Sequence, residues 1–303
     1  MTDVLHPRAF RVTVVWTLLL LFLGSVVHAT ESSLACPDWP TCFGTMVPEM
    51  SGGVFWEHLH RLVAGGLVLM FSLATWLAYK ETRDRPWIIK ACWAGIALLL
   101  VQSAFGGLTV IYRLPDLVST THLALAFGFL ALATHLAAAT VTPREALSPD
   151  AGITLWARVA AGLVFVQSVL GGLVRHIDAG MACPDAPLCL GQVVPPLINA
   201  PIITHFSHRV LALIVVLVVL GLVVRVWRGG ASAPLKRWAA GAGVLVLVQV
   251  ALGVASVLSV LAVAPVSLHT LVAAGLLAAL VYLSGLASPT PLREPRAMAA
   301  TAA

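Results

Sequence analysis

Long apolar stretches with few charges constrain this chain more than any other feature of it. A helix needs about 20 apolar residues to cross the hydrocarbon core of a bilayer. Eight stretches meet that need, at approximately residues 12–29, 59–79, 91–112, 119–141, 154–174, 201–224, 238–260 and 266–287. The last two belong to one charge-free run, Trp238 to Leu292, and Pro265 with the small residues near it marks the expected turn. The sequence therefore predicts an all-α, polytopic membrane protein with eight transmembrane helices.

The composition excludes several other classes of protein. Of the 303 residues, 59% are hydrophobic and only 10% are charged, whereas a soluble domain carries about 25% charged residues. A cytosolic enzyme, a disordered protein and a nucleic-acid-binding protein are therefore excluded. The first apolar stretch follows Arg8 and Arg11 as a signal peptide would, but it is longer than the usual apolar core and lacks a good cleavage site. We expect it to be a retained helix.

The lysines and arginines predict the orientation in the cell membrane. Positive charge gathers in the cytoplasmic segments of membrane proteins. With the N-terminus inside, 14 of the 18 basic residues are cytoplasmic: Arg8, Arg11, Lys80, Arg83, Arg85, Lys90, Arg144, Arg158, Arg225, Arg228, Lys236, Arg237, Arg293 and Arg296. Both termini are then cytoplasmic, and the net charge of +5 needs no acidic ligand to explain it.

The chain repeats itself at one offset. The segment from Cys36 to Cys42 recurs 147 residues later as Cys183 to Cys189. At offsets of 147 or 148, these residues recur as well: His28 as His176, His60-Arg61 as His208-Arg209, Gln102 as Gln249, Gly106 as Gly253, and His122 as His269. We expect two tandem four-helix bundles, residues 1–148 and 149–303, related by a pseudo-two-fold axis along the membrane normal.

Four histidines stand out within the predicted spans. His60 and His122 lie at the outer ends of the second and fourth spans, and His208 and His269 occupy the matching places in the second half. In a four-helix bundle such a pair can face one another across the core. Two opposed imidazoles suit the two axial positions of a haem iron, whereas zinc takes three or four ligands. A hydrogen-bonded core histidine is the alternative for any one of them, and their repetition favours ligation.

One carboxylate distinguishes the two halves. Glu57 precedes His60 by three residues, whereas His205 precedes His208 at the matching place. A buried carboxylate beside a haem is a candidate acid, base or proton relay. The alternatives are a residue open to external water or an ion pair with Arg61. The difference suggests that one half performs chemistry while the other stores a cofactor or passes electrons.

The predicted outer loops carry the remaining candidate residues. Arg61 and Arg209 are candidates to pair with haem propionates, with simple interfacial anchoring as the alternative. The cysteine pairs Cys36–Cys42 and Cys183–Cys189 lie on the oxidising side of the membrane, so two disulfides are expected. A structural role is the simpler interpretation of these disulfides, and a redox relay is the other. Cys92, within a span, is expected to pack.

In this order, these motifs resemble the haem A synthase family over nearly the whole chain. The resemblance rests on Glu57-x-x-His60-Arg61, His122, His208-Arg209, His269 and the paired cysteines, which look like those of the Bacillus-type branch. It implies oxidation of the C8 methyl of haem O to a formyl group by two successive hydroxylations. It also implies a haem b cofactor, with its iron on His208 and His269, and haem O between His60 and His122 with Glu57 near the methyl. A link to the prenyltransferase that makes haem O is expected from the family.

Three other functions remain open. A bis-histidine di-haem cytochrome that only passes electrons explains the histidines but not Glu57. A membrane thiol oxidoreductase explains the cysteines but not the histidines, and a porphyrin transporter would need sites more open than two disulfide-capped ones. The residues do not identify the electron acceptor, the oxygen source or the oligomeric state. Nor do they decide whether one histidine leaves the substrate iron, which two axial histidines would otherwise close to oxygen.

Overall fold

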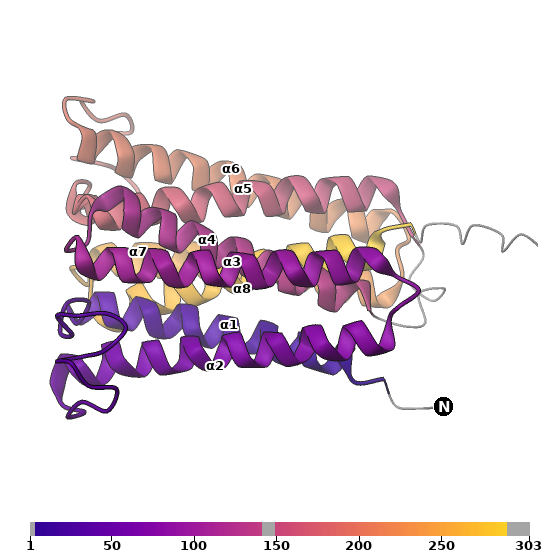
Figure 1. Ribbon diagram of the computed structural model, residues 1–303. Coiled ribbons are helices and arrows are strands. Elements are labelled where there is room, and N and C mark those ends of the chain that lie inside the picture. Colours follow the sequence, from indigo (N-terminus) through magenta and orange to yellow (C-terminus); the bar gives the residue numbers. More distant parts are fainter. Residues whose placement is uncertain (1–3, 141–148, 290–303) are drawn as a thin grey trace, which may run out of the picture.

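The computed structural model describes residues 4–140 and 149–289 of the chain. Within these ranges, eight helices are long and apolar enough to cross a membrane (Figure 1). They are α1 (His6–Ala29), α2 (Gly52–Glu81), α3 (Pro86–Ile111), α4 (Asp116–Ala139), α5 (Ala151–His176), α6 (Ala200–Arg228), α7 (Ala233–Leu258) and α8 (Val263–Ala287), with a short 3-10 helix, η2 (Ala179–Met181). The prediction of an all-α protein with eight spans is confirmed.

Most helices extend beyond the apolar stretches that predicted them. Helix α2 begins at Gly52 and not near residue 59, because the backbone continues its hydrogen-bonded ladder into the interfacial residues. The predicted position of the last turn was wrong: Ser259–Ala262 form it, and Pro265 lies in the first turn of α8. Proline is tolerated there because the first amides of a helix have no intrahelical acceptor.

The helices form two rings of four neighbours. In the first ring α1 packs on α2, α2 on α3, α3 on α4 and α4 on α1; α5, α6, α7 and α8 pack in the same cyclic order. Helices α4 and α8 pack on one another between the rings, flanked by contacts of α1 with α8 and of α4 with α5. This order places α2 diagonally opposite α4, and α6 diagonally opposite α8. The pseudo-two-fold relation stays a prediction, and the expected boundary at residue 148 lies outside the described residues.

The backbone repeats at the offset seen in the sequence. Left-handed residues recur in pairs: Glu31 and Asp178 at φ 54° and 53°, and Phe43 and Leu190 at 54° in both loops. The loops between Cys36 and Cys42 and between Cys183 and Cys189 lie at the same end of the molecule, at the left of Figure 1. We call this end the loop end.

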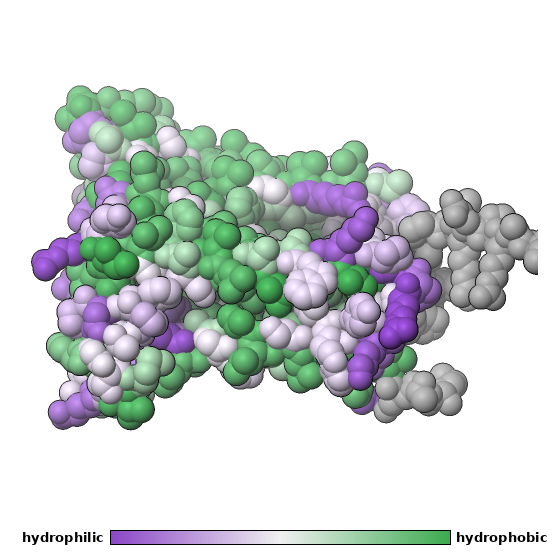
Figure 2. Space-filling view, in the orientation of Figure 1, coloured by the Kyte–Doolittle hydropathy of each residue, from purple (hydrophilic) through white to green (hydrophobic). Residues whose placement is uncertain are grey.

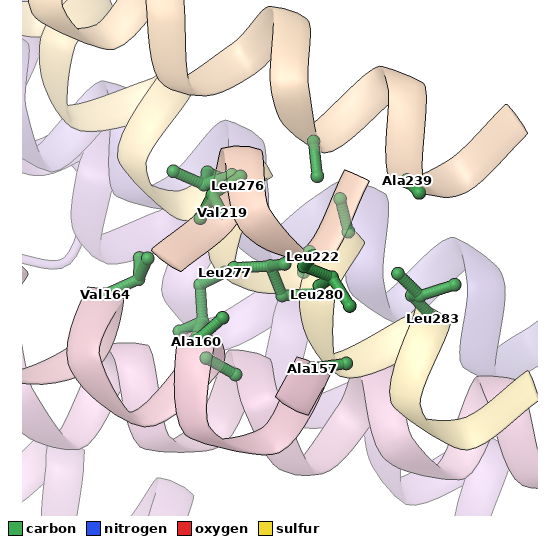
Figure 3. Packing of buried hydrophobic residues seen from close by; sticks show 14 of the residues in the cluster. Ala157, Ala160, Val164, Val219, Leu222, Ala239, Leu276, Leu277, Leu280 and Leu283 are labelled. Carbon is green, nitrogen blue, oxygen red and sulfur yellow. The ribbon is translucent and has the colours of Figure 1, made fainter. Parts of the chain in front are cut away.

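The close-packed apolar core occupies only part of each bundle. One cluster of buried residues joins α5, α6, α7 and α8, and Figure 3 shows its members interdigitating. A second cluster joins the four helices of the first ring, with Phe71 and Phe129 in edge-to-face contact. On α2, α4, α6 and α8 the buried members of these clusters begin at Leu67, Phe127, Val215 and Ala274, each beyond a candidate histidine as seen from the loop end. The candidate histidines therefore lie on the loop-end side of the two main apolar clusters.

Apolar residues cover the outside of the helices, and hydrophilic ones gather at the two ends (Figure 2). Many of the large exposed side chains are leucine, valine or tryptophan on the helices, such as Leu69 and Trp93. Such a surface is unfavourable in water and suits contact with lipid.

We predict that the contact between α4 and α8 limits the stability of the protein. A Cβ added to Gly285 would lie 2.5 Å from the Cβ of Ala138, whereas one added to Gly275 on the same helix would meet no atom within 4 Å. Gly285→Ala should lower the free energy of unfolding by about 1–3 kcal/mol because of overpacking. Gly275→Ala should be neutral or stabilising by up to about 1 kcal/mol. Thermal unfolding in detergent tests both, and equal effects would contradict the predicted interface.

Candidate functional site

The four candidate histidines lie at matched depths in their helices. His60 and His208 are each the ninth residue of α2 and α6, and His122 and His269 are each the seventh residue of α4 and α8. At a rise of 1.5 Å per residue they lie about 9–12 Å inside the loop end of each helix. They are therefore further from the helix ends than the sequence had predicted.

Each of these imidazoles rests against a glycine of a neighbouring helix. A Cβ on Gly24 would lie 3.0 Å from Cε1 of His60, and one on Gly106 would lie 3.1 Å from Cε1 of His122. The second half repeats this arrangement, with 2.9 Å from Gly171 to His208 and 3.1 Å from Gly253 to His269. Because glycine has no Cβ, the edge of each ring can lie against its backbone, whereas the Cβ of any other residue would displace the ring. We call them the glycine seats.

Glutamines lie beside three of the four rings. Nε2 of Gln102 lies 3.4 Å from Nε2 of His122, and Nε2 of Gln249 lies 3.1 Å from Nε2 of His269. Nε2 of Gln167 lies 3.0 Å from Nδ1 of His208. The side-chain oxygens of these three glutamines are buried and have no hydrogen-bond partner among the described residues.

The donor set fits a haem better than a bare metal ion. His60 and His122 lie on the diagonal helices α2 and α4, and His208 and His269 lie on the diagonal helices α6 and α8. The buried Nδ1 atoms of His60, His122 and His269 have no partner within the described part of the chain. A zinc site would require three or more metal-ligating side chains close together. No such group occurs among the described residues. Each bundle thus offers two diagonal imidazoles, the number that a haem iron takes.

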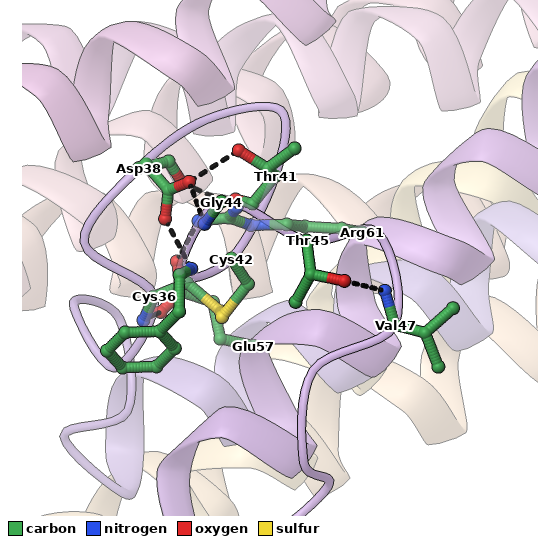
Figure 4. Close-up of a disulfide and its surroundings, with 10 residues drawn as sticks. Cys36, Asp38, Thr41, Cys42, Gly44, Thr45, Val47, Glu57 and Arg61 are labelled. Carbon is green, nitrogen blue, oxygen red and sulfur yellow. Dashed lines mark hydrogen bonds and ion pairs between the residues drawn. A yellow bond between two sulfur atoms is a disulfide. The ribbon is translucent and has the colours of Figure 1, made fainter.

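Both predicted disulfides are present. The Cα atoms of Cys36 and Cys42 are 4.8 Å apart, and those of Cys183 and Cys189 are 4.6 Å apart. Each loop is closed further by an aspartate: Asp38 accepts hydrogen bonds from the amides of Phe43 and Gly44 and from the hydroxyl of Thr41 (Figure 4). Cys92 is a buried free thiol, as predicted.

Glu57 is tied to the disulfide loop. Its carboxylate accepts a hydrogen bond from the amide of Cys36 at 2.8 Å and forms an ion pair with Arg61 at 2.6 Å (Figure 4). Its exposed fraction is only 4%, so the alternative of a residue open to water was wrong and the ion pair is present. In the second half His205 instead lies with its Nδ1 2.9 Å from the carbonyl of Ala179.

The two arginines fasten the loops to the helices. Arg61 donates to the carbonyls of Asp38 and Thr41 at 2.8 and 2.6 Å. Arg209 donates to the carbonyls of Asp185 and Leu188 at the same distances, and also to that of Cys183 at 2.6 Å. Anchoring is therefore one role that both arginines perform.

Sequence reasoning missed the seats on α1 and α5 and the contact of Gln167. Gly24 and Gly171 recur at an offset of 147, so the repeat alone could have identified them as a pair. Their contact with a histidine could not be predicted, because it depends on which helix lies beside which.

Known proteins resemble the chain along most of its length. The family model COX15-CtaA, described as cytochrome oxidase assembly protein, matches residues 8–54 and 49–281. The chain belongs to this family. A relative from Symbiobacterium thermophilum named heme A synthase is 31% identical, with 90% of this chain and 92% of the relative covered. Proteins of the same name from Shewanella oneidensis and Shouchella clausii are 29% and 30% identical over 82% of this chain, and 86% and 85% of those proteins are covered.

We predict that acid loosens both disulfide loops. The hydroxyl of Thr41 and the amides of Gly44 and Phe43 hold the pKa of Asp38 below its usual value. The amides of Gly191 and Leu190 lower the pKa of Asp185 in the same way. Since the ionised form is the one that the loop binds, this stabilisation is complete above about pH 4 and is lost as the pH falls below it.

Hydrogen exchange of peptides spanning residues 36–45, corrected for the intrinsic pH dependence of exchange, measures this effect. Protection should fall as the pH drops below about 4 in the wild type. Asp38→Asn should exchange faster at neutral pH and should lose the acid step, while the loop around Asp185 keeps its own. Protection that is independent of pH in the wild type would contradict the prediction.

Proposed function

We propose that this protein is a haem A synthase, an oxidoreductase that oxidises the C8 methyl of haem O to a formyl group by two successive hydroxylations. The observation that carries the proposal is the set of four imidazoles, each against a glycine seat, at matched depths on α2, α4, α6 and α8. Membership of the COX15-CtaA family and relatives named heme A synthase support the same function.

In this proposal the two bundles divide the work. Haem O, the substrate, binds in residues 1–148 between His60 and His122, and haem b, the cofactor, is held through its iron by His208 and His269 in residues 149–303. Glu57 supports this assignment. On α2, α4, α6 and α8 it is the one carboxylate within a helical turn of a candidate histidine, and His205 takes its place in the second bundle. Haem b, when bound, supplies one-electron redox chemistry.

Glu57 is the group that we propose acts beside the reacting methyl. Both of its oxygens accept hydrogen bonds, from Arg61 and from the amide of Cys36. A carboxylate held in this way has a fixed direction and can take a proton as the methyl or an attacking water loses one. Proximity to His60, one helical turn further along α2, would bring the carboxylate to the rim of the substrate haem.

The same proposal includes the orientation in the membrane, the propionate contacts and a partner protein. We place both termini in the cytoplasm and the loop end at the outer face of the cell membrane, so that the disulfides lie on the oxidising side. Propionate contacts by Arg61 and Arg209 would use guanidinium donors that the loop carbonyls leave available. Association with the prenyltransferase that makes haem O belongs to the proposal, and copurification of the two proteins tests it.

The haem content of the purified protein tests the proposed reaction. Coexpressed with a source of haem O, the wild type should contain haem b together with haem A. Glu57→Gln should contain haem b with haem O or its hydroxymethyl derivative, because the proton acceptor is lost. Removing one general base lowers a rate by about 10²–10⁴-fold, so haem A should be nearly absent.

Glu49→Gln is the matched control, since Glu49 is exposed in the same loop region and its loss should leave haem A formation unchanged. Chromatography of extracted haems separates the products. Two equivalents of haem b, indifferent to haem O and to the Glu57 substitution, would refute the synthase and leave a di-haem cytochrome.

We also predict that the glycine seats determine haem retention. Gly171→Ala would place a Cβ 2.9 Å from Cε1 of His208, whereas Gly162→Ala on the same helix would meet no atom within 4 Å. Displacing a ligand by a few tenths of an ångström weakens iron binding, and we expect haem b to be lost about tenfold faster from Gly171→Ala. Transfer of haem to apomyoglobin measures the rate, and equal rates in the two variants would show that the seats do not position the ligand.

A further inference from the structure

The first candidate histidine of each bundle, His60 or His208, has different neighbours. Gln167 lies one helical turn before the seat Gly171 on α5, and its Nε2 lies 3.0 Å and 3.3 Å from Nδ1 and Nε2 of His208. The same atom donates to the carbonyl oxygen of His208 at 2.9 Å. The amide thus touches both the ring and the backbone of this one residue.

Leu20 occupies the matching place in the first bundle. It lies 147 residues before Gln167 and one turn before the seat Gly24 on α1, whose Cβ would touch Cε1 of His60. Leu20 packs against the apolar cluster of the first ring and has no polar atom to offer. Nδ1 of His60 is buried and has no hydrogen-bond partner among the described residues.

The other two histidines do not show this difference. His122 lies beside Gln102, and His269 lies beside Gln249. Among the described residues, His60 is the one candidate ligand with no glutamine amide beside its ring. In these amide contacts, the described parts of the two bundles therefore differ at the pair Leu20 and Gln167.

A partner that fixes the orientation of a ligating imidazole strengthens metal binding. Loss of such a partner typically costs 10–100-fold in metal affinity. Nε2 of Gln167 donates to the carbonyl oxygen of His208 and lies against the ring, so the amide holds this residue through both its backbone and its imidazole.

We propose that Gln167 locks His208 as a permanent ligand, and that Leu20 leaves His60 free to turn away from the iron, so that this pair determines which haem is retained and which is exchanged. The inference rests on the proposed function and deepens it. A substrate must enter and leave, and a closed bis-histidine iron must open one side to react. Gln167 is a positioning residue in this scheme, because it acts through His208.

The reciprocal exchange of the two residues tests the proposal without using turnover. Protein loaded with haem b in both bundles should release haem to apomyoglobin in a fast phase and a slow phase, and the fast phase should be missing in His60→Ala. Leu20→Gln should slow the fast phase about 10–100-fold, and Gln167→Leu should accelerate the slow phase by a similar factor. The double variant should interchange the two rates.

Carbon monoxide binding to the reduced haems provides a spectroscopic signature that a packing change alone would not produce. In the wild type the haem of the first bundle should bind carbon monoxide and that of the second should not. Leu20→Gln should abolish binding, and Gln167→Leu should add a second carbon monoxide-binding haem. Leu20→Met and Gln167→Met are the matched controls: the first should behave as the wild type and the second as Gln167→Leu, because methionine has the length but not the amide.

The possible failures are distinguishable. If both bundles hold haem and neither release nor carbon monoxide binding follows the exchange, the roles of Leu20 and Gln167 are refuted while the synthase proposal stands. If the first bundle binds no haem at all, the proposed function fails together with the inference. A variant that loses the haem of both bundles has a general folding defect. In that case haem release and carbon monoxide binding of Leu20→Met and Gln167→Met test the proposal.

Discussion

The contact between an imidazole edge and a glycine backbone organises the functional half of this protein. Four helices carry a histidine, four others carry the seat, and each pair spans two neighbouring helices of one ring. A Cβ at any seat would lie about 3 Å from the ring, so the helices could approach as closely only with glycine. The seats hold the rings by contact with rigid backbone, where precise positioning costs little side-chain entropy.

This arrangement depends on the division of each bundle along the membrane normal. Buried leucine, valine, alanine and phenylalanine side chains fill the half away from the loops, and they give the helices a fixed spacing there. The half near the loops contains histidines, glutamines and glycines, several of which are buried without a partner. Buried polar groups without partners are costly, so their gathering on facing helices indicates a site whose cost is offset when a ligand is bound.

The disulfide loops connect the surface of the protein to the same region. Arg61 and Arg209 bind loop carbonyls in both bundles, but only the first bundle adds Glu57 to the network through the amide of Cys36. The two bundles thus share a scaffold, and beside their first histidines they differ in Glu57 against His205 and in Leu20 against Gln167. A duplicated fold can acquire two tasks in this way, since few substitutions alter the site without altering the packing.

Hydropathy and the repeated spacing determined the eight helices, the tandem organisation as a hypothesis, the two disulfides and the four histidines. These features could be predicted because lipid requires continuous apolar helices and because a duplicated chain repeats the same residues at one offset. Other features were decided only by the tertiary structure: that Gly24 faces His60, that Gln167 binds His208, that Glu57 meets the amide of Cys36, and that the histidines lie two turns inside the helices. Each of these is a contact between elements distant in sequence, and the apolar pattern of a membrane helix does not specify which neighbour its polar residues will face.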